Sequence, residues 1–189
     1  MIIINCEYRG IYMYKGKLVK LRAYREDDIE RAVEFINDEE TKRFLDTSIP
    51  FPTTKWEEEE WIKSRKSNKD FTYDFAIEDL ETGKYIGGCS INHCDVKNRN
   101  CTIGIMIGDK DYWEKGYGTD ALKVLIRFIF EEVNMDKIKL GVFSFNTRAI
   151  ACYKKVGFIE EGVLKKELYR YGKYNDVIQM ALFKEDWIN

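Results

Sequence analysis

Two glycines in a Gly-x-Gly arrangement carry the clearest chemical signal in the sequence. Gly116 and Gly118 lie between an apolar stretch and the start of a long apolar helical pattern. Glycine lets the backbone turn tightly and approach a ligand without a Cβ in the way. The free N–H groups at a helix N-terminus also favour an anion. The pattern therefore predicts a phosphate or pyrophosphate site, although a plain turn would give the same two residues.

Two familiar nucleotide-binding motifs do not fit this glycine loop. A dinucleotide-binding fold needs a parallel sheet before the loop and an acid about 20 residues further on. The strands predicted before this loop, described below, form an antiparallel meander instead. A P-loop needs a lysine directly after its last glycine, and Thr119 follows Gly118 instead. A module that binds some other nucleotide or sugar phosphate remains an alternative.

Metal-ligating residues are few and poorly spaced. His93 is the single histidine, and the five cysteines form no CxxC pair. A four-ligand zinc site would need an unusual set of partners, so we predict no metal site. We interpret the cysteines as reduced thiols, mostly small buried apolar residues of a cytosolic protein. They are Cys6, Cys89, Cys94, Cys101 and Cys152.

The composition indicates one packed domain. The chain has 189 residues, of which 44% are hydrophobic and 14% aromatic. At this length roughly two-thirds of the surface of the unfolded chain can be buried, so the fold needs no disulfide or structural metal for stability. A net charge of −2 gives no overall attraction to nucleic acid or anionic lipid, and we expect neither partner. The apolar run at residues 1–4 is too short for a membrane span and lacks a signal-peptide layout, so we expect a cytoplasmic protein.

The first third of the chain is predicted to hold one strand and two helices. Residues 1–16 lack a periodic pattern and are interpreted as an arm or an extra edge strand, leaving residues 17–189 as the domain. Pro50 and Pro52 mark a loop. The predicted elements are a strand at 17–23, a helix at about 27–36, a loop at 46–55 and a helix at 55–65.

The middle of the chain changes to a period of two. Alternating apolar and polar residues separated by short turns predict three strands of an antiparallel meander. The predicted strands are 71–78, 85–92 and 101–108.

After the glycine loop the order becomes helix, strand, helix. The first helix is apolar on nearly all sides and must lie across a sheet, which predicts a parallel strand–helix–strand crossover. Asn146 and Gly157 have the residue types that begin and end a short helix. The predicted elements are helices at 119–133 and 146–156 and strands at 137–145, 163–169 and 174–182. The fold class is therefore α/β with a mixed sheet.

Two sequence blocks in this order resemble the GNAT superfamily of acetyl-CoA-dependent N-acetyltransferases. The family's Gln/Arg-x-x-Gly-x-Gly/Ala loop is similar to Trp113-Glu-Lys-Gly-Tyr-Gly118, except that tryptophan stands at the first position. Its second signature, Asn-x-x-Ala-x-x-x-Tyr-x-x-x-Gly-Phe, is similar to residues 146–158. The resemblance spans about residues 18–187 and implies a GNAT-like mixed sheet with helices on both faces.

The C-terminal strands resemble one branch of the superfamily. Glu161-Gly-Val-Leu164 and Tyr169-x-x-Gly-Lys-Tyr-x-Asp176 are similar to the ribosomal-protein alanine N-acetyltransferases (RimJ/RimL-like). Spermidine N-acetyltransferases share much of the same layout.

The resemblance implies a set of residues that bind acetyl-CoA. Backbone groups of one strand would pair with the pantetheine arm, much as a peptide adds to an open sheet edge. The glycine loop would hold the pyrophosphate, and Asn146 would both cap a helix and contact the arm. The implied residues are Ile105, Met106, Ile107, Glu114, Lys115, Gly116, Tyr117, Gly118, Thr119 and Asn146.

Tyr153 is the implied catalytic residue. It shares an apolar helix face with Ala149 and Ile150, which alone would suggest a core aromatic. The resemblance implies that its phenol protonates the departing CoA thiolate. A phenol with a pKa near 10 needs help from geometry or desolvation to protonate a thiolate with a pKa of about 8.5.

The acceptor amine must be uncharged to attack the thioester. At pH 7 a lysine-like amine with a pKa of about 10.4 is neutral in well under 0.1% of molecules, whereas an α-amine near 7.8 is neutral in over 10%. His93 and Glu78 are candidate bases, and a water chain is a third. Phe51, Trp56 and the acidic run Glu57–Glu60 are candidates for the acceptor wall, although such a run is commonly a solvated helix face.

The resemblance therefore implies acetyl transfer from acetyl-CoA to a primary amine by direct attack in a ternary complex. We expect a protein N-terminal amine as acceptor, with a polyamine such as spermidine or an amino sugar as the alternative. A non-catalytic sensor of CoA or another phosphate ligand is the alternative of another class. The chain could be a monomer or a homodimer.

Overall fold

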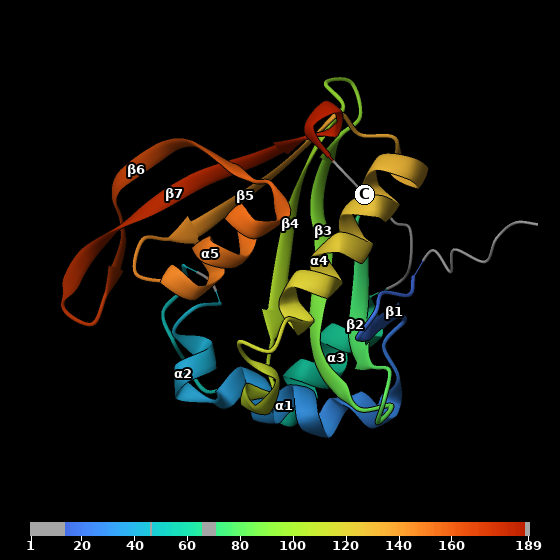
Figure 1. Ribbon diagram of the computed structural model, residues 1–189. Coiled ribbons are helices and arrows are strands. Elements are labelled where there is room, and N and C mark those ends of the chain that lie inside the picture. Colours follow the sequence, from blue (N-terminus) through green and yellow to red (C-terminus); the bar gives the residue numbers. More distant parts are fainter. Residues whose placement is uncertain (1–13, 46, 66–70, 188–189) are drawn as a thin grey trace, which may run out of the picture.

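A seven-stranded mixed sheet forms the centre of the molecule (Figure 1). The computed structural model describes residues 14–45, 47–65 and 71–187. The strand order is β1-β2-β3-β4-β5-β7-β6, and only β4 and β5 pair in parallel. The predicted meander and parallel crossover are confirmed. The strands are β1 (Val19–Arg22), β2 (Tyr73–Asp79), β3 (Tyr85–Asp95), β4 (Asn100–Ile107), β5 (Lys137–Phe143), β6 (Ile159–Arg170) and β7 (Lys173–Phe183).

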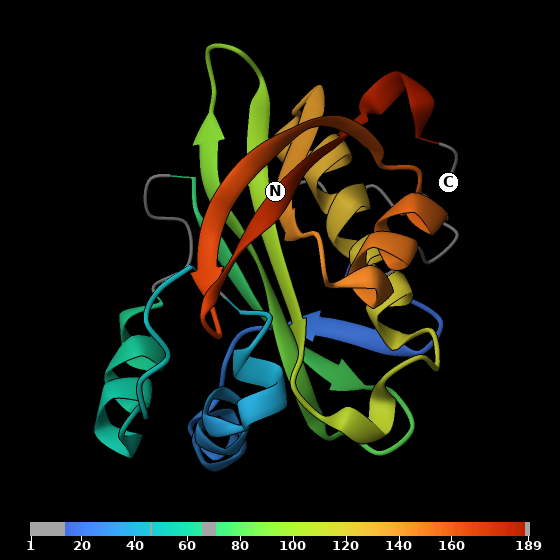
Figure 2. The same ribbon diagram turned by 90° about the vertical axis from the view of Figure 1, so that its left-hand side faces the viewer.

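Helices cover both faces of the sheet, as the family resemblance implies. Helices α4 and α5 lie on one face, and α1 and α3 lie on the other (Figures 1 and 2). None of the helices in the described ranges is long and apolar enough to cross a membrane. The helices are α1 (Ile29–Asn37), α2 (Glu39–Lys42), α3 (Lys55–Ser64), α4 (Tyr117–Phe128) and α5 (Thr147–Val156), with short 3-10 turns at Glu26–Asp28, Lys110–Tyr112 and Lys184–Asp186.

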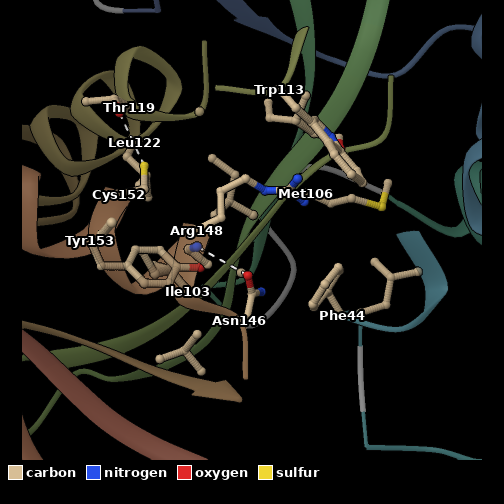
Figure 3. Close-up of a pocket in the computed structure, with 18 of the residues that line it drawn as sticks. Phe44, Ile103, Met106, Trp113, Thr119, Leu122, Asn146, Arg148, Cys152 and Tyr153 are labelled. Carbon is tan, nitrogen blue, oxygen red and sulfur yellow. Dashed lines mark hydrogen bonds between the residues drawn. The ribbon is translucent and has the colours of Figure 1, made fainter. Parts of the chain in front are cut away.

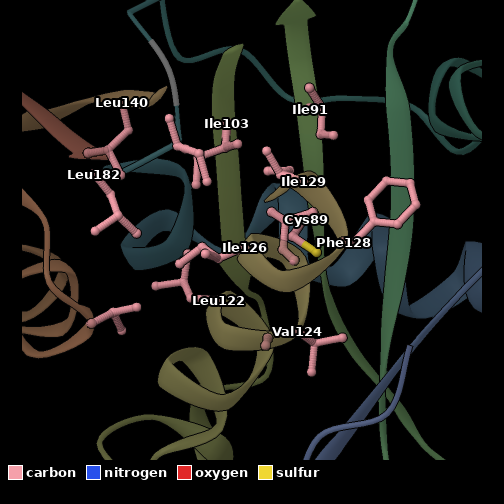
Figure 4. Close-up of a cluster of buried hydrophobic side chains, with 14 of the residues drawn as sticks. Cys89, Ile91, Ile103, Leu122, Val124, Ile126, Phe128, Ile129, Leu140 and Leu182 are labelled. Carbon is pink, nitrogen blue, oxygen red and sulfur yellow. The ribbon is translucent and has the colours of Figure 1, made fainter. Parts of the chain in front are cut away.

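The main core lies between α4 and the sheet. Leu122, Ile126 and Ile129 are fully buried there, against residues of β3 and β4 such as Cys89 and Ile103 (Figure 4). Burying apolar side chains of this size stabilises a fold by about 1.5–3 kcal/mol each. The prediction that this apolar helix lies across the sheet is therefore confirmed.

An aspartate in the first turn of α4 holds the start of the described chain. The Asp120 carboxylate accepts backbone N–H groups from Lys17 (3.1 Å), Leu18 (2.7 Å) and Val19 (3.1 Å). A helix N-terminus favours negative charge, which explains why this position suits an acid. The contact fixes edge strand β1 to the same helix end that carries the glycine loop.

Several element boundaries differ from the sequence prediction. Helix α4 begins at Tyr117 and ends at Phe128, and a π-helical turn covers Ile129–Val133. Strand β3 continues to Asp95, and β5 stops at Phe143. The single-turn helix α2 was not predicted, because four residues hold no helical period; Asp38 caps it by accepting the Thr41 N–H at 2.9 Å.

The C-terminal hairpin differs most from its predicted length. Strand β6 begins at Ile159, earlier than expected, and most of its residues are exposed. A strand exposed on both faces lacks the apolar alternation by which strands are found in a sequence. The predicted N-terminal arm at 1–16 lies almost entirely outside the described residues, although Lys15 forms an isolated antiparallel bridge with Lys20.

Candidate active site

A cavity of about 660 Å³ opens where β4 and β5 separate. The two strands pair only through residues 100–102 of β4 and 137–139 of β5. Beyond Thr102, the edge of β4 that faces β5 has no partner strand among the described residues. Ile105, Met106 and Ile107 line the cavity from this edge. Their pairing with the arm of acetyl-CoA, which the family resemblance implies, stays a prediction.

The N-terminus of α4 forms one end of the cavity. Gly116 is the N-cap residue, and its φ of 91° lies in the left-handed region that suits glycine. A Cβ on Gly118 would meet no atom closer than 3.6 Å, so the backbone there is open. The first N–H groups of a helix have no intrahelical partner and favour an anion. The loop therefore fits a diphosphate in backbone conformation and electrostatic character.

The predicted loop residues divide into two groups. Glu114, Gly116, Gly118 and Thr119 line the cavity, whereas Lys115 and Tyr117 do not. Tyr117 instead packs edge-on against Tyr112, with ring centroids 4.7 Å apart. The Tyr112 hydroxyl donates to Asp79 at 3.2 Å, so the last residue of β2 helps to hold Tyr112 beside the loop.

Asn146, the N-cap residue of α5, and Tyr153 within α5 both line the cavity (Figure 3). Asn146 Oδ1 accepts the Ala149 N–H at 3.2 Å, so the predicted helix cap is confirmed. The Asn146 amide nitrogen keeps its donors available to a ligand. Tyr153 is 9% exposed, and burial raises the pKa of its phenol well above the ordinary range. Its hydroxyl hydrogen-bonds to none of the described residues, which leaves it available in the cavity.

Arg148 and Trp113 form a stacked pair across the cavity. The Arg148 guanidinium carbon lies 3.5 Å from the centroid of the Trp113 ring. It also lies 5.7 Å from the ring of Phe44, a residue of the turn that follows α2 (Figure 3). The Trp113 indole N–H donates to the Ile107 carbonyl at 2.6 Å, which fixes the ring at the end of β4. In the sequence, Trp113 stands out only as a departure from the family pattern, and no signal predicts a role for Arg148.

Cys152 lies beside the glycine loop. Its Sγ is 3.3 Å from Thr119 Oγ1, and this contact joins α5 to the start of α4. Burial raises the pKa of the Cys152 thiol, which keeps it protonated and weakly reactive at neutral pH.

Neither candidate base is among the described residues that line the cavity. His93 is exposed on β3 opposite Thr102. Glu78 is engaged by Arg22, whose Nε donates to it at 2.5 Å. Burial favours a higher pKa for Glu78, but the hydrogen bond and charge of Arg22, with Lys20 and Arg25, outweigh burial and lower the pKa. A carboxylate held in this way is a weak base. Both assignments stay predictions that the cavity geometry does not favour.

The candidate acceptor-wall residues also lie outside the cavity lining. Phe51 is 76% exposed and Trp56 is 73% exposed. The acidic run on α3 is not uniformly solvated, because Glu58 is only 7% exposed. Burial raises the pKa of its carboxyl, which Arg65 offsets only in part. The part of the chain near α2 that does line the cavity is Thr41, Phe44 and Leu45.

Comparison with known proteins is consistent with this geometry. The model of the GNAT acetyltransferase domain matches residues 19–159. Over 180 residues the chain is 30% identical to YokL, an uncharacterised N-acetyltransferase from the SPbeta prophage of Bacillus subtilis; the match covers 94% of this chain and 97% of YokL. It is 32% identical over 108 residues to YdaF of the same organism, provisionally named a ribosomal N-acetyltransferase; that match covers 57% of this chain and 58% of YdaF.

A solved structure shows the same fold. The spermidine N-acetyltransferase of Vibrio cholerae, in complex with CoA and spermine, superimposes with a TM-score of 0.80 at 24% identity. The superposition covers 91% of this chain and 99% of that one. The chain therefore belongs to the GNAT family of acetyltransferases, enzymes that use acetyl-CoA.

Proposed function

We propose that this enzyme acetylates the α-amine of a protein N-terminus by direct attack in a ternary complex. The observation that carries the proposal is the lack of a strong base in the cavity. The described lining contains no histidine, and its one carboxylate, Glu114, belongs to the glycine loop. An acceptor that is already partly neutral at physiological pH suits such a site best.

The pKa of the acceptor decides between amines. An α-amine with a pKa of about 7.8 is neutral in over 10% of molecules at pH 7, and a polyamine nitrogen near 10.4 in well under 0.1%. The difference is a factor of several hundred in the attacking species. A polyamine acceptor would therefore need a base, which the described cavity lining does not supply.

The charge of the cavity supports the same choice. Its described lining carries Arg148 and Lys155 against the single carboxylate of Glu114. Opposite charge concentrates a cationic substrate, and like charge repels it. Spermidine remains the alternative acceptor, supported by likeness to the spermidine acetyltransferases rather than by the charge of this site.

Three features of the chain supply the chemistry in this proposal. The amides after Gly116 hold the diphosphate of acetyl-CoA. A backbone N–H of residues 105–107 stabilises the negative charge that develops on the acyl oxygen. The C–N bond forms as the C–S bond breaks; the Tyr153 phenol gives its proton to the leaving thiolate, and the proton that the amine nitrogen releases restores the phenol. We place this activity in the cytoplasm and assign it to residues 17–189 as one domain.

Acetylation of a panel of acceptors tests the proposal. The panel contains tripeptides with free N-termini, the same tripeptides with blocked N-termini and a free lysine, and spermidine. We expect kcat/KM to be highest for the free N-termini, with mass spectrometry placing the acetyl group on the α-nitrogen. A preference for spermidine or the lysine side chain would refute the acceptor assignment. Tight CoA binding without turnover on any amine would favour the sensor.

A further inference from the structure

The guanidinium of Arg148 is a cation inside the cavity, and it has no counter-ion among the described residues. It lines the cavity, is half-buried, and makes neither an ion pair nor a hydrogen bond to any described side chain or carbonyl. Its guanidinium lies over the rings of Trp113 and Phe44. Arginines enclosed in this way normally pair with a carboxylate or a phosphate.

Stacking fixes the guanidinium without using its hydrogen-bond donors. A guanidinium flat on an indole is held by its face, while its N–H groups point outward in the plane. Trp113 is itself fixed by its 2.6 Å hydrogen bond to the Ile107 carbonyl. The pair is therefore positioned before any ligand arrives, which lowers the entropy lost on binding.

We propose that Arg148 is an anion-binding residue of this active site and takes a phosphate or carboxylate oxygen in a two-pronged hydrogen bond. Two ligands of the proposed reaction carry such oxygens. Trp113 precedes the glycine loop, so a phosphate of acetyl-CoA is one source. Phe44 comes from the turn after α2 and not from the strand or loop assigned to acetyl-CoA, so a carboxylate close to the N-terminal amine of the acceptor is the other. The acceptor source rests on the proposed function.

Binding measurements on three variants test the proposal. Arg148→Gln removes the charge, and Arg148→Lys keeps the charge but loses the planar fork. Lys154→Gln removes a second basic residue of the same helix, which is exposed and lies outside the cavity lining, and serves as the matched control. Thermal unfolding checks that all three variants remain folded.

Two arms distinguish the two anions. The first measures the Kd of acetyl-CoA by calorimetry without an acceptor. The second measures KM, at saturating acetyl-CoA, for tripeptides that begin with Asp or with its neutral analogue Asn. We expect Arg148→Gln to weaken one arm by about 10-fold to 100-fold, the range of a charged hydrogen bond. A weaker acetyl-CoA Kd would show that Arg148 binds a phosphate of the cofactor. A higher KM for the Asp peptide alone would show that Arg148 binds the carboxylate of the acceptor. Arg148→Lys should recover part of the loss, and Lys154→Gln should change either constant by less than about threefold.

The proposal fails if folded Arg148→Gln leaves the acetyl-CoA Kd and the Asp-to-Asn ratio of KM within about twofold of the unmodified enzyme. The first arm needs no turnover. If the enzyme acetylates no peptide, the acceptor assignment is refuted, and an unchanged acetyl-CoA Kd for folded Arg148→Gln then refutes the role of Arg148 as well. Trp113→Ala should reproduce part of the Arg148→Gln loss. The double variant should lose no more than Arg148→Gln alone, because the indole acts through the guanidinium.

Discussion

Replacing Tyr153 by phenylalanine separates catalysis from folding in this enzyme. The change removes one hydroxyl group and keeps the ring, which is 9% exposed and packs 5.8 Å from the ring of Phe158. Because the hydroxyl has no hydrogen-bond partner among the described residues, its loss should leave the free energy of unfolding within about 1 kcal/mol of the original. The transfer step should suffer far more. General acid catalysis typically contributes about 100-fold to 10,000-fold, and 100-fold corresponds to about 2.7 kcal/mol in activation free energy.

The pH dependence follows from burial of the same phenol. Burial raises the pKa of Tyr153, so the group stays protonated beyond pH 10, where a free tyrosine would ionise. The phenol is therefore protonated throughout the usual assay range; because a higher pKa also makes it a weaker acid, the transfer depends on its geometry next to the thiolate. We expect kcat of the unmodified enzyme to show no alkaline fall below about pH 10 from this group.

Thiol release from acetyl-CoA at saturating acceptor measures kcat. Calorimetry with acetyl-CoA should give an unchanged Kd, because the phenol is assigned to the leaving group and not to binding. Tyr169→Phe, at a position 62% exposed on β6, is the matched control and should keep full activity. A Tyr153→Phe enzyme with kcat within twofold of the original would refute the proton-donor role.

Three further predictions follow from the backbone and the charges. Gly116→Ala, at φ 91°, should lower the free energy of unfolding by about 1–2 kcal/mol, while Gly162→Ala, with open space around its Cα, should be tolerated; thermal unfolding compares them. The lowered pKa of Glu78 means that its ion pair with Arg22 stabilises the fold above the unfolded pKa of about 4.3 and is lost as pH falls through the lower folded pKa. Urea unfolding should therefore depend less steeply on pH in that acidic range for Glu78→Gln, and an unchanged slope would contradict the assignment. The pKa of Glu58 is shifted in the opposite direction, upwards, so ionisation of its carboxyl destabilises the fold. Glu58→Gln should therefore raise the free energy of unfolding at pH 7, and a lower value would contradict this prediction.

Local patterns predicted the parts of the site that depend on backbone. Glycine spacing before an apolar helix located the α4 N-terminus, and an asparagine before a helical period located the cap of α5. Both features act within a few residues of the chain. The crossover between β4 and β5 could be predicted from the order of the elements alone, because strand–helix–strand connections between parallel strands are almost always right-handed and few topologies remain.

Side-chain partners from distant segments could not be predicted in the same way. Arg148 stacks on Trp113, 35 residues earlier, and no spacing rule links the two positions. Glu78 was proposed as a base from its place near a strand end, but its pairing with Arg22 depends on how β1 lies beside β2. Phe51 and Trp56 looked like binding aromatics, yet a sequence does not tell an exposed ring from one that lines a cavity.

Through the carboxylate of Asp120, ligand binding in the cavity should affect hydrogen exchange at backbone amides outside it. Because this side chain holds the amides of residues 17–19 at the helix end that faces the ligand, tightening of that helix turn should slow hydrogen exchange at the sheet's first edge. A ligand bound on one side of α4 would thus be detectable on the other, in amides that never touch it.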